Sequence, residues 1–127
     1  MVMSELPFRC GMEAVVNLIG GKWKILILFH LRDGKLRFSV LRRLVGQVSE
    51  KMLSQQLKEL VEDGLLRRID HKTVPPHVEY ELTAFGINFC HSLQAVCEWG
   101  AANMDKVTAI AEARTVRQNA KATLPRA

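Results

Sequence analysis

The sequence has few cysteines, few aromatic residues and no long apolar run, and each shortage excludes a class of protein. The three cysteines are too few and too oddly numbered for a secreted disulfide framework; they are Cys10, Cys90 and Cys97. The most apolar stretch, 23–31, is interrupted by Lys24 and His30 and is far shorter than a membrane span. No charged and then apolar leader opens the chain. We therefore expect a cytoplasmic protein without a membrane partner.

The motifs of common catalytic sites are also missing. The sequence contains no phosphate-binding loop, no nucleophile elbow and no paired carboxylates, and its one reactive candidate, Cys10, has no assignable base. The histidines have no metal-ligand spacing relative to the cysteines; they are His30, His71, His77 and His91. We therefore expect a protein that is not an enzyme and that binds neither a cofactor nor a metal.

Composition and charge favour a folded protein with an anionic partner. Hydrophobic residues make up 48% of the 127 residues, which is enough for a core, and the net charge is +5. Such a balance suits a polyanion. The charge is uneven, however, because residues 49–82 hold five Lys or Arg against seven acidic residues. A nucleic-acid surface would therefore depend on where a few cations lie.

Glycine and proline pairs divide the chain into short segments. Apolar periodicity predicts helices at 12–19, 22–32, 39–45, 49–63 and 84–104, and strands at 36–38, 65–71 and 78–82. A helix, a tight turn and a second helix followed by a two-stranded ribbon form a winged helix-turn-helix. The fold class is α+β, mainly α, with a long C-terminal dimerisation helix.

We expect four parts in the chain. An N-terminal arm at 1–9 precedes the winged domain at 10–83, which is followed by the dimerisation region at 84–112 and a basic, helical or frayed tail at 113–127. The helix at 22–32 is apolar nearly all round and should lie at the centre of the core.

Two helices are expected to form the helix-turn-helix. Ser39 is the expected N-cap of the first and Ser49 of the second. Two sets of apolar residues should turn inward, namely Leu41, Leu44 and Val45 in the first helix and Leu53, Leu57, Leu60 and Val61 in the second.

The outward face of the second helix is the main candidate for contact with double-stranded DNA. Any amphipathic surface helix has such a face, but here a basic ribbon with two prolines in its loop follows it. We expect Ser49 and Lys51 to contact phosphate, Ser54 or Gln55 to read bases, and Lys58 to lie near the groove rim. The other expected DNA contacts are Arg37, Arg67, Arg68, His71 and Lys72. RNA binding is disfavoured by the scarcity of aromatic residues.

The C-terminal helix has a wider apolar arc than one small domain needs to cover. It could fold back on its own core, but a homodimer interface is favoured because a large exposed apolar patch is a liability on a monomer. The residues expected at this interface are Phe85, Phe89, Leu93, Val96 and Trp99.

Several motifs together resemble the HxlR-type transcriptional regulators, relatives of the MarR type. They include Ile19-Gly20-Gly21-Lys22-Trp23-Lys24, Leu36-Arg37-Phe38, Asp63-Gly64-Leu65 and Pro75-Pro76-x-Val78-Glu79-Tyr80. The resemblance covers about residues 10–100. It implies a homodimeric DNA-binding regulator in which residues 49–63 enter the major groove and residues 69–80 lie along the adjacent backbone.

The resemblance also implies a role for Cys10, since several relatives sense electrophiles or oxidants through a cysteine that matches it. The sequence departs from the family pattern at Gly11, where proline is common. A position after Arg9 and before a helix favours a thiolate, but an isolated cysteine at a helix start is as often a packed apolar residue. Cys90 and Cys97 are expected in the core.

The sequence therefore predicts a sequence-specific DNA-binding regulator, a repressor, that acts as a homodimer and is controlled by oxidation or alkylation of Cys10. Its partners would be DNA, a second copy and a small electrophile or oxidant. The alternative is a winged helix that serves as a protein-interaction module without specific DNA binding.

Overall fold

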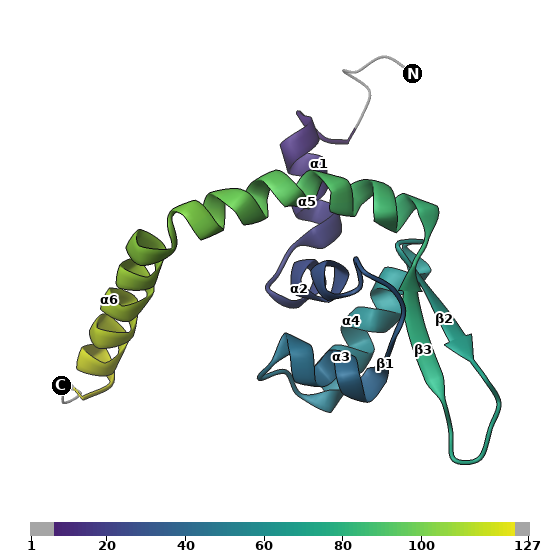
Figure 1. The fold of residues 1–127 in the computed structure, drawn as a ribbon. Coiled ribbons are helices and arrows are strands. Elements are labelled where there is room, and N and C mark those ends of the chain that lie inside the picture. Colours follow the sequence, from purple (N-terminus) through teal and green to yellow (C-terminus); the bar gives the residue numbers. More distant parts are fainter. Residues whose placement is uncertain (1–6, 124–127) are drawn as a thin grey trace. The chain divides into compact units, whose positions relative to one another are not determined.

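Helices and strands follow one another in the predicted order (Figure 1). The computed structural model describes residues 7–123. Its elements are α1 (Gly11–Ile19), α2 (Trp23–His30), β1 (Leu36–Arg37), α3 (Phe38–Val45), α4 (Glu50–Glu62), β2 (Leu66–Asp70), β3 (Val78–Leu82), α5 (Ala84–Ala102) and α6 (Met104–Thr123). Residues up to His91 and residues from Ser92 onward form two compact units.

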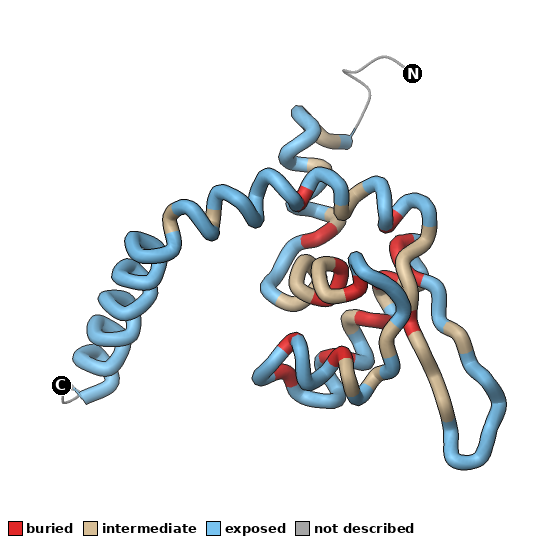
Figure 2. The backbone as a smooth tube through the Cα atoms, viewed as in Figure 1, coloured by how far each residue is buried: buried red, intermediate tan, exposed pale blue. Residues whose placement is uncertain are grey.

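Helix α2 lies at the centre of the first unit, as its apolar character predicts. Ile27 and Leu28 are fully buried, and α2 packs against both α3 and α4. The buried stretches in Figure 2 gather where these helices and the sheet meet. Burial of a large aliphatic side chain stabilises the fold by about 1.5–3 kcal/mol, so these contacts fix the arrangement of the three helices.

The turn between α3 and α4 is as short as predicted. Gly46 has a φ of +101°, a conformation that other residues adopt only with strain, and its carbonyl oxygen accepts a hydrogen bond from the Val48 amide at 2.8 Å. Val48 is buried, which anchors the turn to the core. The two helices therefore keep a fixed relation to each other.

The three strands form one antiparallel sheet in the order β1-β3-β2. The hairpin of β2 and β3 extends beyond the helices (Figure 1) and is the wing of the fold. Tyr80, in the middle of the central strand, is buried in the core. Its cross-strand neighbours Leu36 and Arg68 share its face of the sheet, and the residues between them point to the opposite face.

Some local predictions were wrong. Phe38 begins α3 rather than ending a strand, and because α3 starts earlier, Arg37 is its N-cap and no side chain caps it, so Ser39 is not a cap. Leu44 is 46% exposed, since the buried residues of that helix are Leu41 and Val45, with Phe38 packed partly against the same core. The predicted C-terminal tail is helical as far as Thr123, and residues 124–127 lie outside the described residues.

None of the helices in residues 7–123 has both the length and the apolar character that crossing a membrane requires. The N-terminal arm predicted at 1–9 falls largely on residues 1–6, which lie outside the described part of the chain.

Gly86 offers a test of the packing between α5 and the start of the wing. A Cβ at this position would overlap the Leu65 carbonyl oxygen and lie 3.1 Å from Leu82 Cδ2. That carbonyl cannot easily move, because it accepts hydrogen bonds from the Thr83 amide and hydroxyl at 3.1 and 3.2 Å. We expect Gly86→Ala to lower the free energy of unfolding by about 1–3 kcal/mol in chemical denaturation.

Gly100 is the matched control for this substitution. It also lies in α5, but a Cβ there would meet no atom within 4 Å. Gly100→Ala should leave stability unchanged or raise it by about 0.5–1 kcal/mol, because alanine favours helix. Equal destabilisation by both variants would contradict the proposed overlap at Gly86.

Candidate nucleic-acid interface

Helix α4 has one buried side and one solvent-exposed side. Leu53, Leu57 and Leu60 are fully buried, and Val61 is half-buried against the same core. The predicted DNA contacts on the other side are exposed, namely Lys51, Ser54, Gln55 and Lys58, and so are Glu50 and Glu62. The predicted polar face of this helix is therefore confirmed as a solvent-accessible surface.

Ser49 caps the N-terminus of α4 as predicted. Its Oγ accepts a hydrogen bond from the Met52 amide at 3.0 Å. The remaining free amides of the first turn, with the positive end of the helix dipole, favour an anion such as a phosphate. Lys51 lies in this first turn and is exposed, so it adds a full positive charge to the same end.

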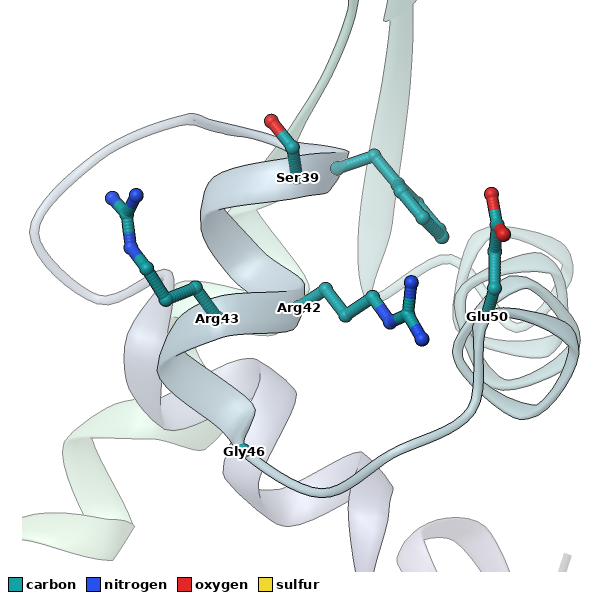
Figure 3. Close-up of a pocket in the computed structure, with 6 residues that line it drawn as sticks. Ser39, Arg42, Arg43, Gly46 and Glu50 are labelled. Atoms are coloured by element: carbon teal, nitrogen blue, oxygen red, sulfur yellow. The ribbon is translucent and has the colours of Figure 1, made fainter.

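A shallow open pocket separates α3 from the start of α4 (Figure 3). Arg42 extends from α3 toward the connecting loop and α4, and its Nε donates a hydrogen bond to the Val48 carbonyl oxygen at 3.3 Å. Arg43 points away on the other side of α3. Both arginines are exposed, but their side chains point in different directions, and Arg42 braces the turn through its hydrogen bond to Val48.

The wing carries the predicted cations, but acidic side chains partly neutralise them. Arg67 and Glu81 are cross-strand neighbours and form an ion pair. Arg68 lies on the opposite face of the sheet, 3.8 Å from the Asp70 carboxylate, in a pair that is about half exposed. Exposed pairs of this kind are weak, so Arg68 is the more available of the two arginines.

Glu79 lies at the centre of a polar cluster on the outer face of the wing. Its Oε1 is 2.5 Å from His71 Nε2, 3.4 Å from His77 Nε2 and 3.9 Å from Lys35 Nζ. The hydrogen bond from His71 lowers the pKa of Glu79, with further lowering by Lys35 and His77, while partial burial opposes this. Partial burial lowers the pKa of His77, as do Arg37 and His71, and Glu79 raises it.

All ten residues predicted to contact DNA are exposed: Arg37, Ser49, Lys51, Ser54, Gln55, Lys58, Arg67, Arg68, His71 and Lys72. Within residues 7–123, no carboxylate lies within ion-pair distance of Arg37, Lys51, Lys58 or Lys72. Helix α4, β1 and the wing loop therefore supply the uncompensated cations. Arg67 and His71 are instead engaged by Glu81 and Glu79.

The spacing of the histidines relative to the cysteines does not indicate the cluster of His71, His77 and Glu79, because its third member is a carboxylate on the other strand of the hairpin from His71. The register of the hairpin reveals the cluster. Residues whose numbers add to 148 face each other across β2 and β3, as Ile69 and Glu79 do, and His71 and His77 continue this pairing just beyond the strands.

The three cysteines have different surroundings. Cys10 is exposed at the N-cap position of α1. Cys90 is half-buried as predicted; its Sγ donates to the Leu28 carbonyl oxygen at 3.5 Å, and burial raises its pKa. Cys97 is exposed, so its predicted place in the core was wrong.

The residues predicted at a homodimer interface divide into two groups. Phe85, Val96 and Trp99 are exposed in the single chain, with Val96 and Trp99 at 60% and 62%. Phe89 packs partly against the core and Leu93 is buried. Helix α6 has no buried residue, and its exposed apolar residues Met104, Val107 and Ile110 recur at helical spacing.

Comparison with known proteins gives consistent matches. A family model described as HxlR-like helix-turn-helix matches residues 18–108. The chain is 45% identical to YtcD of Bacillus subtilis (strain 168) over 83% of each chain, and 43% identical to YtfH of Escherichia coli (strain K12) over 84% of each. Both relatives are named as uncharacterized HTH-type transcriptional regulators.

Solved structures of other proteins also resemble this chain. The redox regulator HypR in its reduced form matches with a TM-score of 0.73 and 39% identity, covering 79% of this chain and 99% of that chain. Its oxidized form matches with a TM-score of 0.69 and 41% identity, covering 74% and 97%.

The two serines that the sequence predicts as N-caps provide a test of how α4 begins. We expect Ser49→Ala to lower the free energy of unfolding by about 0.5–2 kcal/mol, because it removes the oxygen that accepts from the Met52 amide. Ser39→Ala is the control and should change stability by less than about 0.5 kcal/mol, because Ser39 is exposed and does not cap α3. Chemical denaturation measures both, and similar losses would show that Ser49 has no special role.

Proposed function

The chain belongs to the HxlR-like helix-turn-helix family of transcriptional regulators, and from that premise we propose that it is a sequence-specific DNA-binding repressor that acts as a homodimer. The observation that carries this proposal is the position of α4. Its leucine stripe is fully buried, and its opposite side exposes cationic and hydrogen-bonding side chains beside a projecting wing.

We assign the contacts on α4 by chemistry and by position. Ser49 and Lys51, at the positive end of the helix, would hold phosphates. Gln55 and Ser54 follow on the exposed side, where a glutamine side chain can pair with both the N6 and the N7 atoms of adenine. Lys58, one turn further along, would approach the rim of the major groove.

The wing would hold the adjacent backbone rather than read bases. Lys72 lies in its loop without an acidic partner in residues 7–123, and Arg68 has only a weak exposed one. Arg37 on β1 adds a third cation. Arg67 and His71 would contribute less, because forming a phosphate contact first requires them to leave Glu81 and Glu79.

A second copy of the chain is the partner that best accounts for the C-terminal region. Most of the stability of helices in proteins comes from packing an apolar face against other elements. Helix α6 buries no residue within the chain. In α5, the large apolar side chains of Val96 and Trp99 are exposed. A two-fold interface over Phe85, Val96 and Trp99, extending to α6, would cover these side chains and present two copies of α4 to one duplex.

Oxidation or alkylation of Cys10 is the proposed control of this regulator. The thiol is exposed, so oxidants and electrophiles reach it, and the similar protein HypR is described as a redox regulator with oxidized and reduced forms. Two Cys10 thiols from different copies would lose two electrons and two protons as a disulfide forms. A small electrophile would instead add to one thiolate.

We expect the protein to select an inverted repeat from a random DNA library, with half-site centres about 10–10.5 base pairs, or a multiple of that, apart. Affinity for that site should fall steeply with salt, and Lys51→Gln, which removes one phosphate contact from each copy of the dimer, should reduce the slope of log affinity against log salt by about 1.8. Gln55→Ala should keep the slope but relax base preference by about 1–3 kcal/mol at particular positions.

Lys106→Gln is the matched control, because it removes an exposed lysine from α6, outside the proposed surface. Its salt slope should equal that of the unmodified protein. A flat salt response, or retention of DNA unaffected by both Lys51→Gln and Gln55→Ala, would favour a protein-interaction module instead. Selected sites without an inverted repeat would contradict the dimer.

Cys10→Ser should keep the fold and DNA affinity but lose any change in affinity on treatment with diamide, which accepts the electrons and protons that disulfide formation releases. Cys97→Ser is the control, because it removes a second exposed thiol and should keep the response. Electrophoretic mobility shifts with and without diamide measure both. A response that survives Cys10→Ser, or disappears with Cys97→Ser, would place the sensing elsewhere.

A further inference from the structure

The base of the wing loop brings two histidines and a glutamate together on one face of the hairpin. The His71 amide donates a hydrogen bond to the His77 carbonyl oxygen at 3.0 Å, so the two histidines face each other where the strands end. Glu79 lies two residues after His77 and therefore on the same face. The two imidazole rings are 4.2 Å apart between centroids.

We propose that His71, His77 and Glu79 bind a divalent transition-metal ion of the zinc type on the outer face of the wing. One ligand atom from each residue lies within 4.8 Å of the other two. Two imidazole nitrogens and one carboxylate oxygen form a common set of three protein ligands for zinc, with a fourth position for water or another ligand. This site goes beyond the proposed function, since it requires only the hairpin.

The distances come close to what such an ion needs. Ligand atoms at about 2.0–2.1 Å from a tetrahedral ion are roughly 3.3–3.4 Å from each other. His77 Nε2 and Glu79 Oε1 already have this separation, at 3.4 Å. His71 Nε2 and Glu79 Oε1 are closer, at 2.5 Å, because they form a direct hydrogen bond. The ion would replace that hydrogen bond and move the two side chains slightly apart.

Nearby cations limit the affinity of the site. Lys35 Nζ lies 3.9 Å from Glu79 Oε1, and Arg37 shares the same face of the sheet as Glu79. The Lys35 side chain is half exposed, so it can turn into solvent when an ion takes its place. We therefore expect binding weaker than at a four-ligand structural zinc site, but specific to these three residues.

Cobalt(II) is a suitable probe, because its visible absorption reports coordination and its thiolate complexes have a distinct charge-transfer band. Titration of the full chain without a histidine tag should give one ion per chain, a tetrahedral spectrum and no thiolate band. His77→Gln and Glu79→Gln should each weaken binding at least about tenfold, since loss even of an outer partner of a metal site has an effect of that size. Competition with zinc should displace the cobalt.

His91→Gln is the matched control, because it removes an exposed histidine outside the wing, and it should leave cobalt affinity unchanged. Circular dichroism of each variant checks that the fold is kept. The substitutions in the wing should not disturb it, because they lie on an exposed hairpin. Equal affinity of His77→Gln and His91→Gln, a thiolate band, or no binding at all would overturn the proposal. DNA affinity is not a readout here, so failure of the metal site leaves the proposed function untouched.

Discussion

Burial of Leu53, Leu57 and Leu60 fixes which side of α4 faces solvent, and the rest of the candidate interface depends on it. These leucines are fully buried where α4 packs against α2 and β2. Each contributes about 1.5–3 kcal/mol, so turning the helix about its axis would expose several kcal/mol of apolar surface. The exposure of Lys51 and Gln55 is therefore a consequence of core packing rather than of local side-chain preference.

The net negative charge of residues 49–82 does not prevent a cationic surface, because the structure uses much of that charge internally. Glu59 pairs with Lys24 of α2 at 2.9 Å, Glu81 pairs with Arg67, and Glu79 lies among Lys35 and two histidines. The acids thus hold α4 and the wing in place. Among the residues predicted to contact DNA, the cations without an acidic partner in residues 7–123 lie on the exposed side of α4, on β1 and in the wing loop.

Apolar periodicity was enough to predict the order of the elements and the exposed face of α4, because burial of the leucine stripe depends only on helical spacing. It could not place features that depend on an exact helix start or on partners distant in the sequence. Ser39 was misassigned because the N-cap of α3 is Arg37, two residues earlier. The pairing of Arg67 with Glu81, and the cluster around Glu79, depend on strand register, which the spacing of single residues does not reveal.

The same register gives the two faces of the wing different chemistry. Arg68 shares a face with buried Tyr80, toward the helices, whereas Arg67, His71 and His77 share the other face with Glu79 and Glu81. A slip of one residue in either strand would exchange the faces and separate each of these groups from its partner. Burial of Tyr80 and Leu66 forbids that slip. The hydrophobic core thus determines which wing cation is available to a phosphate and which side chains meet at Glu79.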